Sequence, residues 1–250
     1  MVQKMHTSGK ITTMKTYMAP MEGITDHIYR NTYREFYGGV DRYCTPFLSP
    51  TDDKSFTTRE KRNIDPSLND VDSVVPQLIT CKSGPFIWGM QQIAKNGFPE
   101  VNLNLGCPSG TVVAKKKGSG FLAYPSELDD FLYEIFDAKA NLNIEISVKT
   151  RLGKNDPDEF FLLLDIFNKY PIKELTIHPR IQSDFYKNDV RLKHFDYAYA
   201  NSNNPLVYNG DVVTSQNFDD ICEKYPDINA VMIGRGLLYY PGFSAFDIEK

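Results

Sequence analysis

Strand-like and helix-like segments alternate along almost the whole chain, and this alternation limits the fold more than any other feature. Eight short segments have the period or apolar character of a β-strand; they are residues 16–20, 40–45, 73–79, 100–105, 143–149, 174–178, 205–209 and 229–233. Helical patterns lie between most of them, at 26–37, 85–96, 126–140, 157–170, 190–201 and 215–224. Such alternation implies parallel strands joined by right-handed crossovers.

Eight strand–helix units in 250 residues predict a closed (β/α)8 barrel, the TIM-barrel class of α/β folds. The alternative is an open, doubly wound sheet, but no Gly-x-Gly-x-x-Gly fingerprint follows any predicted strand. Residues 1–15 are polar and lack the apolar core of a signal peptide. We interpret them as a disordered leader that precedes one barrel domain over 16–250.

Charge and cysteine usage narrow the classes of function. The formal net charge of −4 gives no overall attraction to nucleic acid, so contacts with RNA would need local basic patches. The four cysteines have no Cys-x-x-Cys spacing, which argues against a zinc site and against a disulfide framework. Reduced thiols suit a cytoplasmic protein. No apolar run approaches the length of a membrane span.

Chemistry in this fold belongs to the carboxyl ends of the strands, so reactive side chains should gather there. Asn102 and Asn104 alternate with apolar residues in 100–105, and Cys107 follows in a Gly-Cys-Pro turn. A buried structural cysteine is the alternative to a reactive thiol. A single polar residue at a strand end is usually a solvated charge on the rim or a satisfied group in the core. Seven strand ends with such residues predict a functional mouth at this end of the barrel. The residues are Glu22, Gln77, Lys149, His178, Arg180, Asn209, Asp211 and Arg235.

Two glycine-bearing turns follow the last two predicted strands, at 209–211 and 234–236. This is the usual phosphate-binding position of the fold, where backbone amides face the anion. A lysine in the mouth beside a histidine suits a flavin, because a cation near N1 and O2 stabilises the reduced, anionic ring. Gln77 has both a donor and an acceptor for the pyrimidine edge of such a ring.

Six motifs occur in a fixed order and together resemble one family. They are Ala19-Pro20-Met21-Glu22-Gly23-Ile24-Thr25-Asp26, Asn102-Leu103-Asn104-Leu105-Gly106-Cys107-Pro108-Ser109, Val148-Lys149-Thr150-Arg151-Leu152-Gly153, Ile177-His178-Pro179-Arg180, Asn209-Gly210-Asp211 and Ile233-Gly234-Arg235-Gly236. The chain thereby resembles the tRNA-dihydrouridine synthases, flavoenzymes built on a TIM barrel, over about residues 17–243. Members of that family carry a helical domain after the barrel. Because this chain ends at Lys250, we expect a truncated eighth helix and no C-terminal helical domain.

The resemblance implies a specific reaction and a set of site residues. FMN would bind in the mouth, NADPH would reduce it, and a uridine of tRNA would become 5,6-dihydrouridine. Cys107 would be the proton donor, while Asn104 and Arg180 would contact the substrate. The cofactor-binding residues would be Pro20, Met21, Glu22, Gln77, Lys149, His178, Asn209, Gly210, Asp211, Gly234 and Arg235. We also expect no metal, in line with the cysteine spacing, and a monomer.

The chemistry of a thiol suits the acid role. An ordinary thiol has a pKa of about 8.5 and is therefore mostly neutral at pH 7, whereas a nucleophile would need a base partner. Residues 106–120 contain no His or Asp that could be one. Three consecutive lysines, Lys115, Lys116 and Lys117, follow the Cys107 turn. They would contact tRNA phosphates; the alternative is a solvated run of charges without a binding role.

Two other functions remain open from the sequence. One is a flavin-dependent reductase of a free pyrimidine or another small molecule, which would need no basic rim. The other is a truncated, non-catalytic tRNA-binding protein. The presence of Cys107, Lys149 and His178 together argues against the second, because a pure binding protein has no need of a thiol above a flavin.

Overall fold

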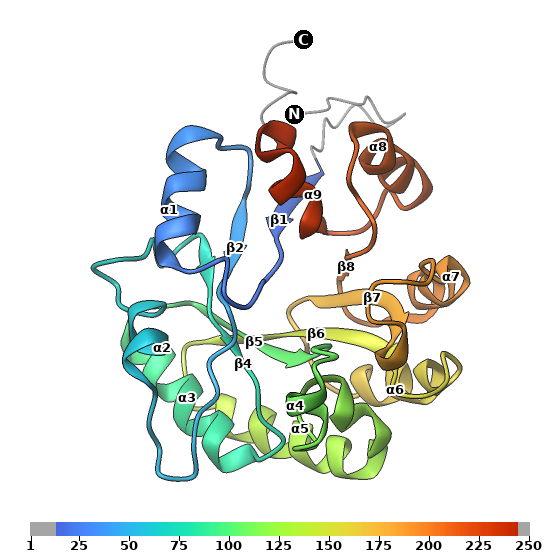
Figure 1. The fold of residues 1–250 in the computed structure, drawn as a ribbon. Coiled ribbons are helices and arrows are strands. Elements are labelled where there is room, and N and C mark those ends of the chain that lie inside the picture. The colour runs from blue at the N-terminus through green and yellow to red at the C-terminus, as the bar shows by residue number, and fades with distance from the viewer. Residues whose placement is uncertain (1–13, 245–250) are drawn as a thin grey trace.

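Nine parallel strands form one sheet in the computed structural model, which describes residues 14–244 (Figure 1). Their order is β3-β2-β1-β9-β8-β7-β6-β5-β4. The predicted leader lies outside the described residues up to residue 13, and so do the last six residues of the chain. The strands are β1 (Lys15–Met18), β2 (Arg42–Cys44), β3 (Val74–Val75), β4 (Gln77–Leu78), β5 (Glu100–Leu105), β6 (Glu145–Gly153), β7 (Leu175–Ile181), β8 (Leu206–Tyr208) and β9 (Ala230–Ile233).

The single strand predicted over 73–79 is split in two by Pro76, whose backbone has no N–H to donate. β3 pairs with β2, and β4 pairs with β5, so this one segment forms both ends of the sheet order and closes the barrel. The carbonyl of Pro76 still accepts the amide of Asn102 at 2.8 Å. With this segment counted once, the barrel has the eight strand positions that the sequence predicts, and the TIM-barrel prediction is confirmed.

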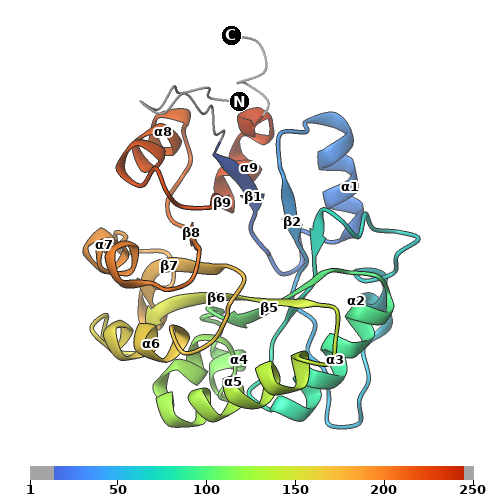
Figure 2. The same cartoon turned by 180° about the vertical axis from the view of Figure 1, so that it is seen from behind.

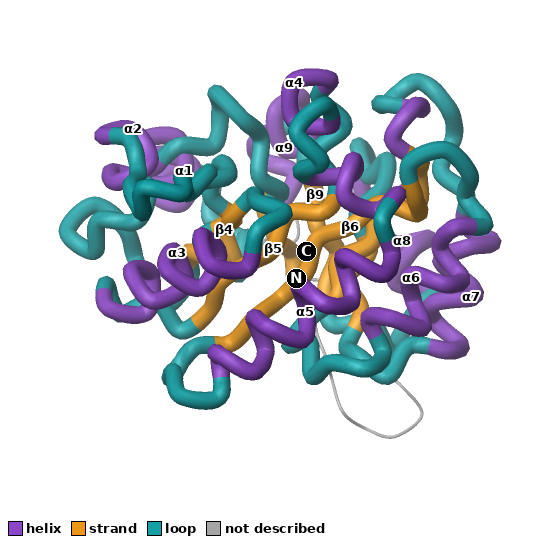
Figure 3. Tube along the Cα trace, turned by 90° about the horizontal axis from the view of Figure 1, so that it is seen from below, coloured by secondary structure: helices purple, strands orange, loops and turns teal. Residues whose placement is uncertain are grey.

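Helices surround the strands, as the views from behind and from below show (Figures 2 and 3). The sequence predicts the six longest helices to within about two residues at most ends. Side-chain caps begin some of them: Asp26 accepts the amide of Tyr29, and Thr214 accepts that of Asn217. The α-helices are α1 (His27–Phe36), α2 (Thr58–Arg62), α3 (Ser83–Lys95), α4 (Gly110–Val113), α5 (Pro125–Lys139), α6 (Glu159–Phe167), α7 (Leu192–Asn201), α8 (Ser215–Lys224) and α9 (Arg235–Tyr239).

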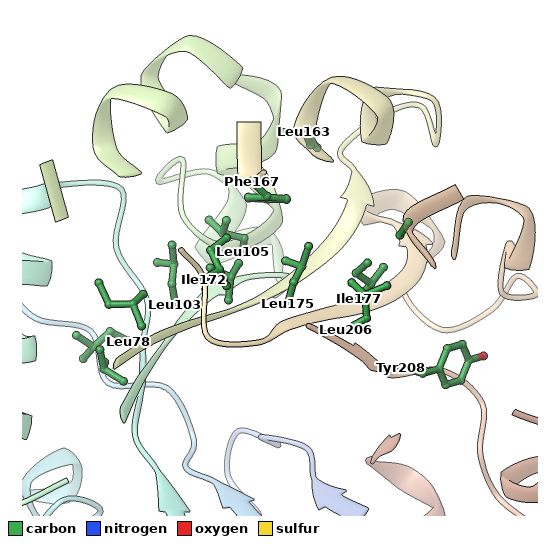
Figure 4. Packing of buried hydrophobic residues seen from close by; sticks show 14 of the residues in the cluster. Leu78, Leu103, Leu105, Leu163, Phe167, Ile172, Leu175, Ile177, Leu206 and Tyr208 are labelled. Atoms are coloured by element: carbon green, nitrogen blue, oxygen red, sulfur yellow. The ribbon is translucent and has the colours of Figure 1, made fainter. Parts of the chain in front are cut away.

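The core lies between the strands and the helices. Leu103 and Leu105 of β5 and Leu175 and Ile177 of β7 are fully buried against this layer (Figure 4). Burying one such side chain stabilises the fold by about 1.5–3 kcal/mol. The alternate residues of the same strands face the barrel axis and are polar. On these two strands, apolar packing therefore faces the helices and polar groups face the barrel axis. The strands on the other side of the barrel contribute a second, smaller cluster of buried apolar residues, formed by Tyr17, Ala19, Cys44, Val75, Val207, Ala230 and Met232.

β6 and β7 extend beyond their predicted ends, by four and three residues. The two strands pair with each other along this extension, where Arg151 lies opposite His178 and Gly153 opposite Ile181. The inward face of β6 therefore continues past Lys149 to Arg151. None of the helices in the described part of the chain has both the length and the apolar character that a membrane crossing requires.

Candidate active site

A pocket of about 400 Å³ opens at the carboxyl ends of the strands. Its lining includes Cys107, Asn104 and all eleven residues that the resemblance assigns to the cofactor. Arg180 and the three consecutive lysines are not part of that lining. The remaining lining residues are Ala19, Ile24, Phe47, Gly106, Pro108, Arg151, Tyr186 and Leu238.

A chain of side-chain amides forms one wall of the pocket. Asn104 Nδ2 donates to Gln77 Oε1 at 2.7 Å, and Gln77 Nε2 donates to Asn102 Oδ1 at 2.7 Å. The carbonyl oxygen of Asn104 accepts the backbone amides of Gly106 and Cys107, at 3.0 and 2.9 Å. One side chain thus fixes both the orientation of Gln77 and the turn that carries the thiol.

The Cys107 thiol is partly buried at the end of β5. Burial raises its pKa, and this effect outweighs the opposing influence of the Ser109 amide and of Arg151 and Lys149. The thiol is therefore protonated at neutral pH. In this state it is a proton donor and a weak nucleophile.

Lys149 points into the pocket from the inward face of β6 and is mostly buried. Within residues 14–244, no carboxylate pairs with its ammonium and no acceptor is hydrogen-bonded to it. Burial, and then repulsion by Arg151, lowers its pKa to about 8. The group stays mostly charged at pH 7, and it can gain a partner only from a molecule that enters the pocket.

Sequence reasoning assigned no role to Arg151 or Tyr186, although both line the pocket. Arg151 donates to the carbonyl oxygens of Gly106, Ile181 and Phe185 at 2.7–2.9 Å, which ties the thiol turn to the loop after β7. The Tyr186 ring lies 5.3 Å from the Arg151 guanidinium carbon. The alternation that places Lys149 on the inward face of β6 also places Arg151 there, so the sequence could have predicted Arg151 as a pocket residue. No sequence pattern indicates Tyr186.

His178 belongs to a polar cluster near the end of β7, in which His178 and Arg180 are buried, Asp211 is exposed and Arg235 is partly exposed. Arg180 Nη1 lies 3.0 Å from His178 Nε2 and also 3.0 Å from Asp211 Oδ1, and Arg180 makes a second bond to Asp211. Arg235 binds the same carboxylate at 2.9 Å. Burial, then the charges of Arg151 and Lys149, lowers the pKa of His178 well below its usual value. Arg180 is 2% exposed and contacts these groups, behind the pocket lining.

Two of the three consecutive lysines have partners within the protein. Lys116 pairs with Glu127 at 3.4 Å and its ammonium lies 4.1 Å from the Tyr124 ring centroid. Lys117 donates to Ser49 Oγ at 2.9 Å. Lys115 is exposed. In the part of the chain that the structure covers, no group of three or more His, Cys, Asp or Glu side chains is placed to hold a metal ion.

A parallel α/β barrel with a polar pocket at the carboxyl ends of its strands has the architecture of the barrel enzymes. Solved structures share this fold at low identity. A variant of NCR from Zymomonas mobilis has a TM-score of 0.56 and 13% identity, covering 90% of this chain and 82% of that one. N-(5'-phosphoribosyl)anthranilate isomerase from Pyrococcus furiosus has a TM-score of 0.52 and 12% identity, covering 93% and 96%.

Sequence comparison gives the family. The chain belongs to the dihydrouridine synthase family, whose model matches residues 17–249. A probable tRNA-dihydrouridine synthase of Staphylococcus aureus is 32% identical over 243 residues, which cover 93% of this chain and 70% of that protein. A tRNA-dihydrouridine(16) synthase of Vibrio vulnificus is 28% identical, over 91% of this chain and 73% of its own length.

Proposed function

We propose that this protein reduces a uridine of tRNA to 5,6-dihydrouridine, with FMN bound in the pocket, NADPH as the electron donor and Cys107 as the proton donor. The family and the names of its relatives support the reaction. The observation that carries the assignment is that one pocket holds both the protonated thiol of Cys107 and the ammonium of Lys149, which has no partner among residues 14–244.

The residues of the pocket fit a flavin mononucleotide. A buried cation without a counter-ion needs a partly negative partner, and the N1–O2 edge of a reduced flavin supplies one to Lys149. Gln77 Nε2 keeps one hydrogen for a ring acceptor, since its bond to Asn102 uses the other. Arg235 and the turns at 209–211 and 234–236 lie at the usual phosphate position of the fold.

A flavin held by these residues would supply hydride transfer between NADPH and C6 of the uracil ring. The protein's own part is the proton. Hydride addition at C6 leaves negative charge on C5 and O4, and the Cys107 S–H donates its proton to C5. The thiolate that remains is stabilised by the nearby positive charges of Arg151 and Lys149 and regains a proton from solvent. Asn104 holds the turn, so the thiol keeps one position through this step.

The test uses purified protein and unmodified tRNA transcript. The wild-type protein is expected to show the visible absorption of oxidised flavin and to form dihydrouridine with NADPH, measured by mass spectrometry of digested tRNA. Cys107→Ala should keep the flavin and lose at least about a hundredfold in rate. Cys222→Ala is the matched control, because Cys222 lies on α8 outside the pocket lining.

Three results would overturn the proposal. Wild-type activity in Cys107→Ala would remove the proton-donor role. Faster reduction of free uridine than of tRNA would favour the small-molecule reductase instead, and a colourless protein that binds tRNA would favour the non-catalytic alternative.

A further inference from the structure

The contact between His178 and Arg180 determines where the imidazole carries its proton. Arg180 Nη1 lies 3.0 Å from His178 Nε2. A guanidinium stays protonated in proteins and can only donate hydrogen bonds, so Nε2 has to be the acceptor. An imidazolium has both nitrogens protonated and cannot accept. It follows that His178 is neutral, with its proton on Nδ1.

Arg180 is held so firmly that it cannot easily turn away from the ring. Its guanidinium makes two hydrogen bonds to Asp211, and its Nε donates to the carbonyl oxygen of Asn188 at 2.5 Å. Arg235 fixes the same Asp211 carboxylate from another element. The Arg180 side chain is 2% exposed. The hydrogen bond to His178 therefore joins two buried side chains, and the exposed Asp211, itself bound by the partly exposed Arg235, holds the Arg180 guanidinium.

The other ring nitrogen of His178 is Nδ1, and the ring is part of the pocket lining. Within residues 14–244, no protein group is hydrogen-bonded to Nδ1. Nδ1 is also not among the fully buried side-chain atoms that lack a hydrogen-bond partner, so it is not sealed inside the protein. Because the His178 ring lines the pocket, its N–H is accessible from there. The N–H can then donate to an atom of a molecule that the pocket holds.

We propose that Arg180 is a positioning residue, which presents His178 to the pocket as a neutral N–H donor through Nδ1, for an acceptor atom of the bound flavin. The identity of the acceptor rests on the proposed function; the position of the proton does not. This gives Arg180 a different role from the substrate contact that the resemblance suggests.

The charges around the His178 ring also favour its neutral form. Asp211 is the carboxylate of this network, and both arginines use it. A positive ring would add to the cations around it, so repulsion and burial both keep His178 neutral. The cations come from three elements; they are Lys149 and Arg151 of β6, Arg180 of β7 and Arg235 of α9.

The first experiment reads the proton directly by long-range ¹H–¹⁵N NMR on the full chain, with His178→Gln to assign the signals. At pH 7 the wild-type ring should have Nδ1 protonated and Nε2 unprotonated. It should stay neutral at pH 6, where an ordinary histidine is mostly protonated. A protonated Nε2 at pH 7, or an imidazolium at pH 6, would overturn the proposal without any variant.

The second experiment removes the guanidinium. In Arg180→Met, His178 should become a mixture of tautomers and should titrate nearer to pH 6.5. Arg235→Met is the matched control. It removes a positive charge and a hydrogen bond to Asp211, but Arg180 still donates to His178 Nε2. The tautomer with the proton on Nδ1 should therefore persist in this variant. An unchanged tautomer in Arg180→Met would refute the role of Arg180. His194, on α7, reports whether each variant is folded, and Arg180→Leu, which also has no donor, replaces the methionine variant if that fails to fold.

The third experiment links the network to the ligand, using FMN and its fluorescence quenching. Arg180→Met and His178→Gln should each weaken FMN binding about tenfold. The double variant should bind no more weakly than His178→Gln alone, because Arg180 acts through the ring. Additive losses, about a hundredfold together, would contradict the positioning role. If the wild-type protein binds no FMN, the proposed function fails, while the NMR result still decides the tautomer.

Discussion

Replacing Lys149 by Met should make the flavin-free protein more stable at neutral pH. The ammonium is buried and has no counter-ion within the described residues, so folding takes a charge out of water without compensation. Methionine has a similar length and no charge, and it suits an irregular, partly apolar site. The gain in the free energy of unfolding follows from the pKa of the lysine in the two states.

The pKa of Lys149 is 10.5 in an unperturbed chain and about 8 in the folded protein. This difference converts to about 3 kcal/mol. Between pH 8 and pH 10.5 the unfolded chain binds the proton and the folded protein does not, so the stability of the wild type rises with pH across that window. Below pH 8 the whole penalty is present. The variant should therefore be more stable by about 3 kcal/mol at pH 7 and by about half of that at pH 9.5.

Urea unfolding of both proteins at pH 7, 8.5 and 9.5 measures this difference. Tyrosines and cysteines titrate in the same range and are common to both proteins. The charge of Lys149 lowers the pKa of Cys44 and of Cys107, so the comparison is made in a background in which both cysteines are replaced by alanine. Lys193→Met, at an exposed lysine of α7, is the control and should show no pH-dependent gain. A Lys149→Met protein that is less stable than wild type at pH 7, or a gain of equal size at pH 7 and pH 9.5, would refute the reasoning.

Three further predictions follow from the core, from a tight turn and from the thiol. Leu103→Ala should lower the free energy of unfolding by about 2–5 kcal/mol in urea, because Leu103 is fully buried in β5. Gly236→Ala should lower the melting temperature and weaken FMN binding, since its Cβ would lie 2.2 Å from the Val212 carbonyl oxygen; Gly84→Ala, with open space around it, should not. Alkylation of Cys107 by iodoacetamide should reach half its maximal rate at a higher pH than for a free cysteine, and a rate already maximal at pH 7 would contradict the raised pKa.

The sequence predicts the fold and the inward faces of the strands well, because both depend on local periodicity. Alternation in β5 and β6 places Asn104 and Lys149 on the polar face, and both line the pocket. The same periodicity does not say where a strand ends. β6 runs on to Gly153 because β7 pairs with it, and that extension brings Arg151 into the pocket.

Other differences arise from contacts between distant parts of the chain. Pro76 interrupts the third strand at the point where the barrel closes, and the pairing on each side of it reveals the break. Tyr186 reaches the pocket from the loop after β7, which has no periodic pattern. Arg180 is expected to contact the substrate, yet Asp211, 31 positions later, binds it behind the pocket lining. Pro76 is a local signal for the break in the strand, but no local signal could predict the placements of Tyr186 and Arg180.

The amide of Asn104 limits how this pocket could be redesigned for another substrate. Since one side chain holds both the thiol turn and Gln77, any replacement there changes two walls together. Phe47 and Leu238 also line the pocket, but their side chains are apolar and hold no such hydrogen bonds. Altered specificity, in evolution or in the laboratory, is therefore expected to begin with these two residues, while the position of Asn104 tolerates little variation.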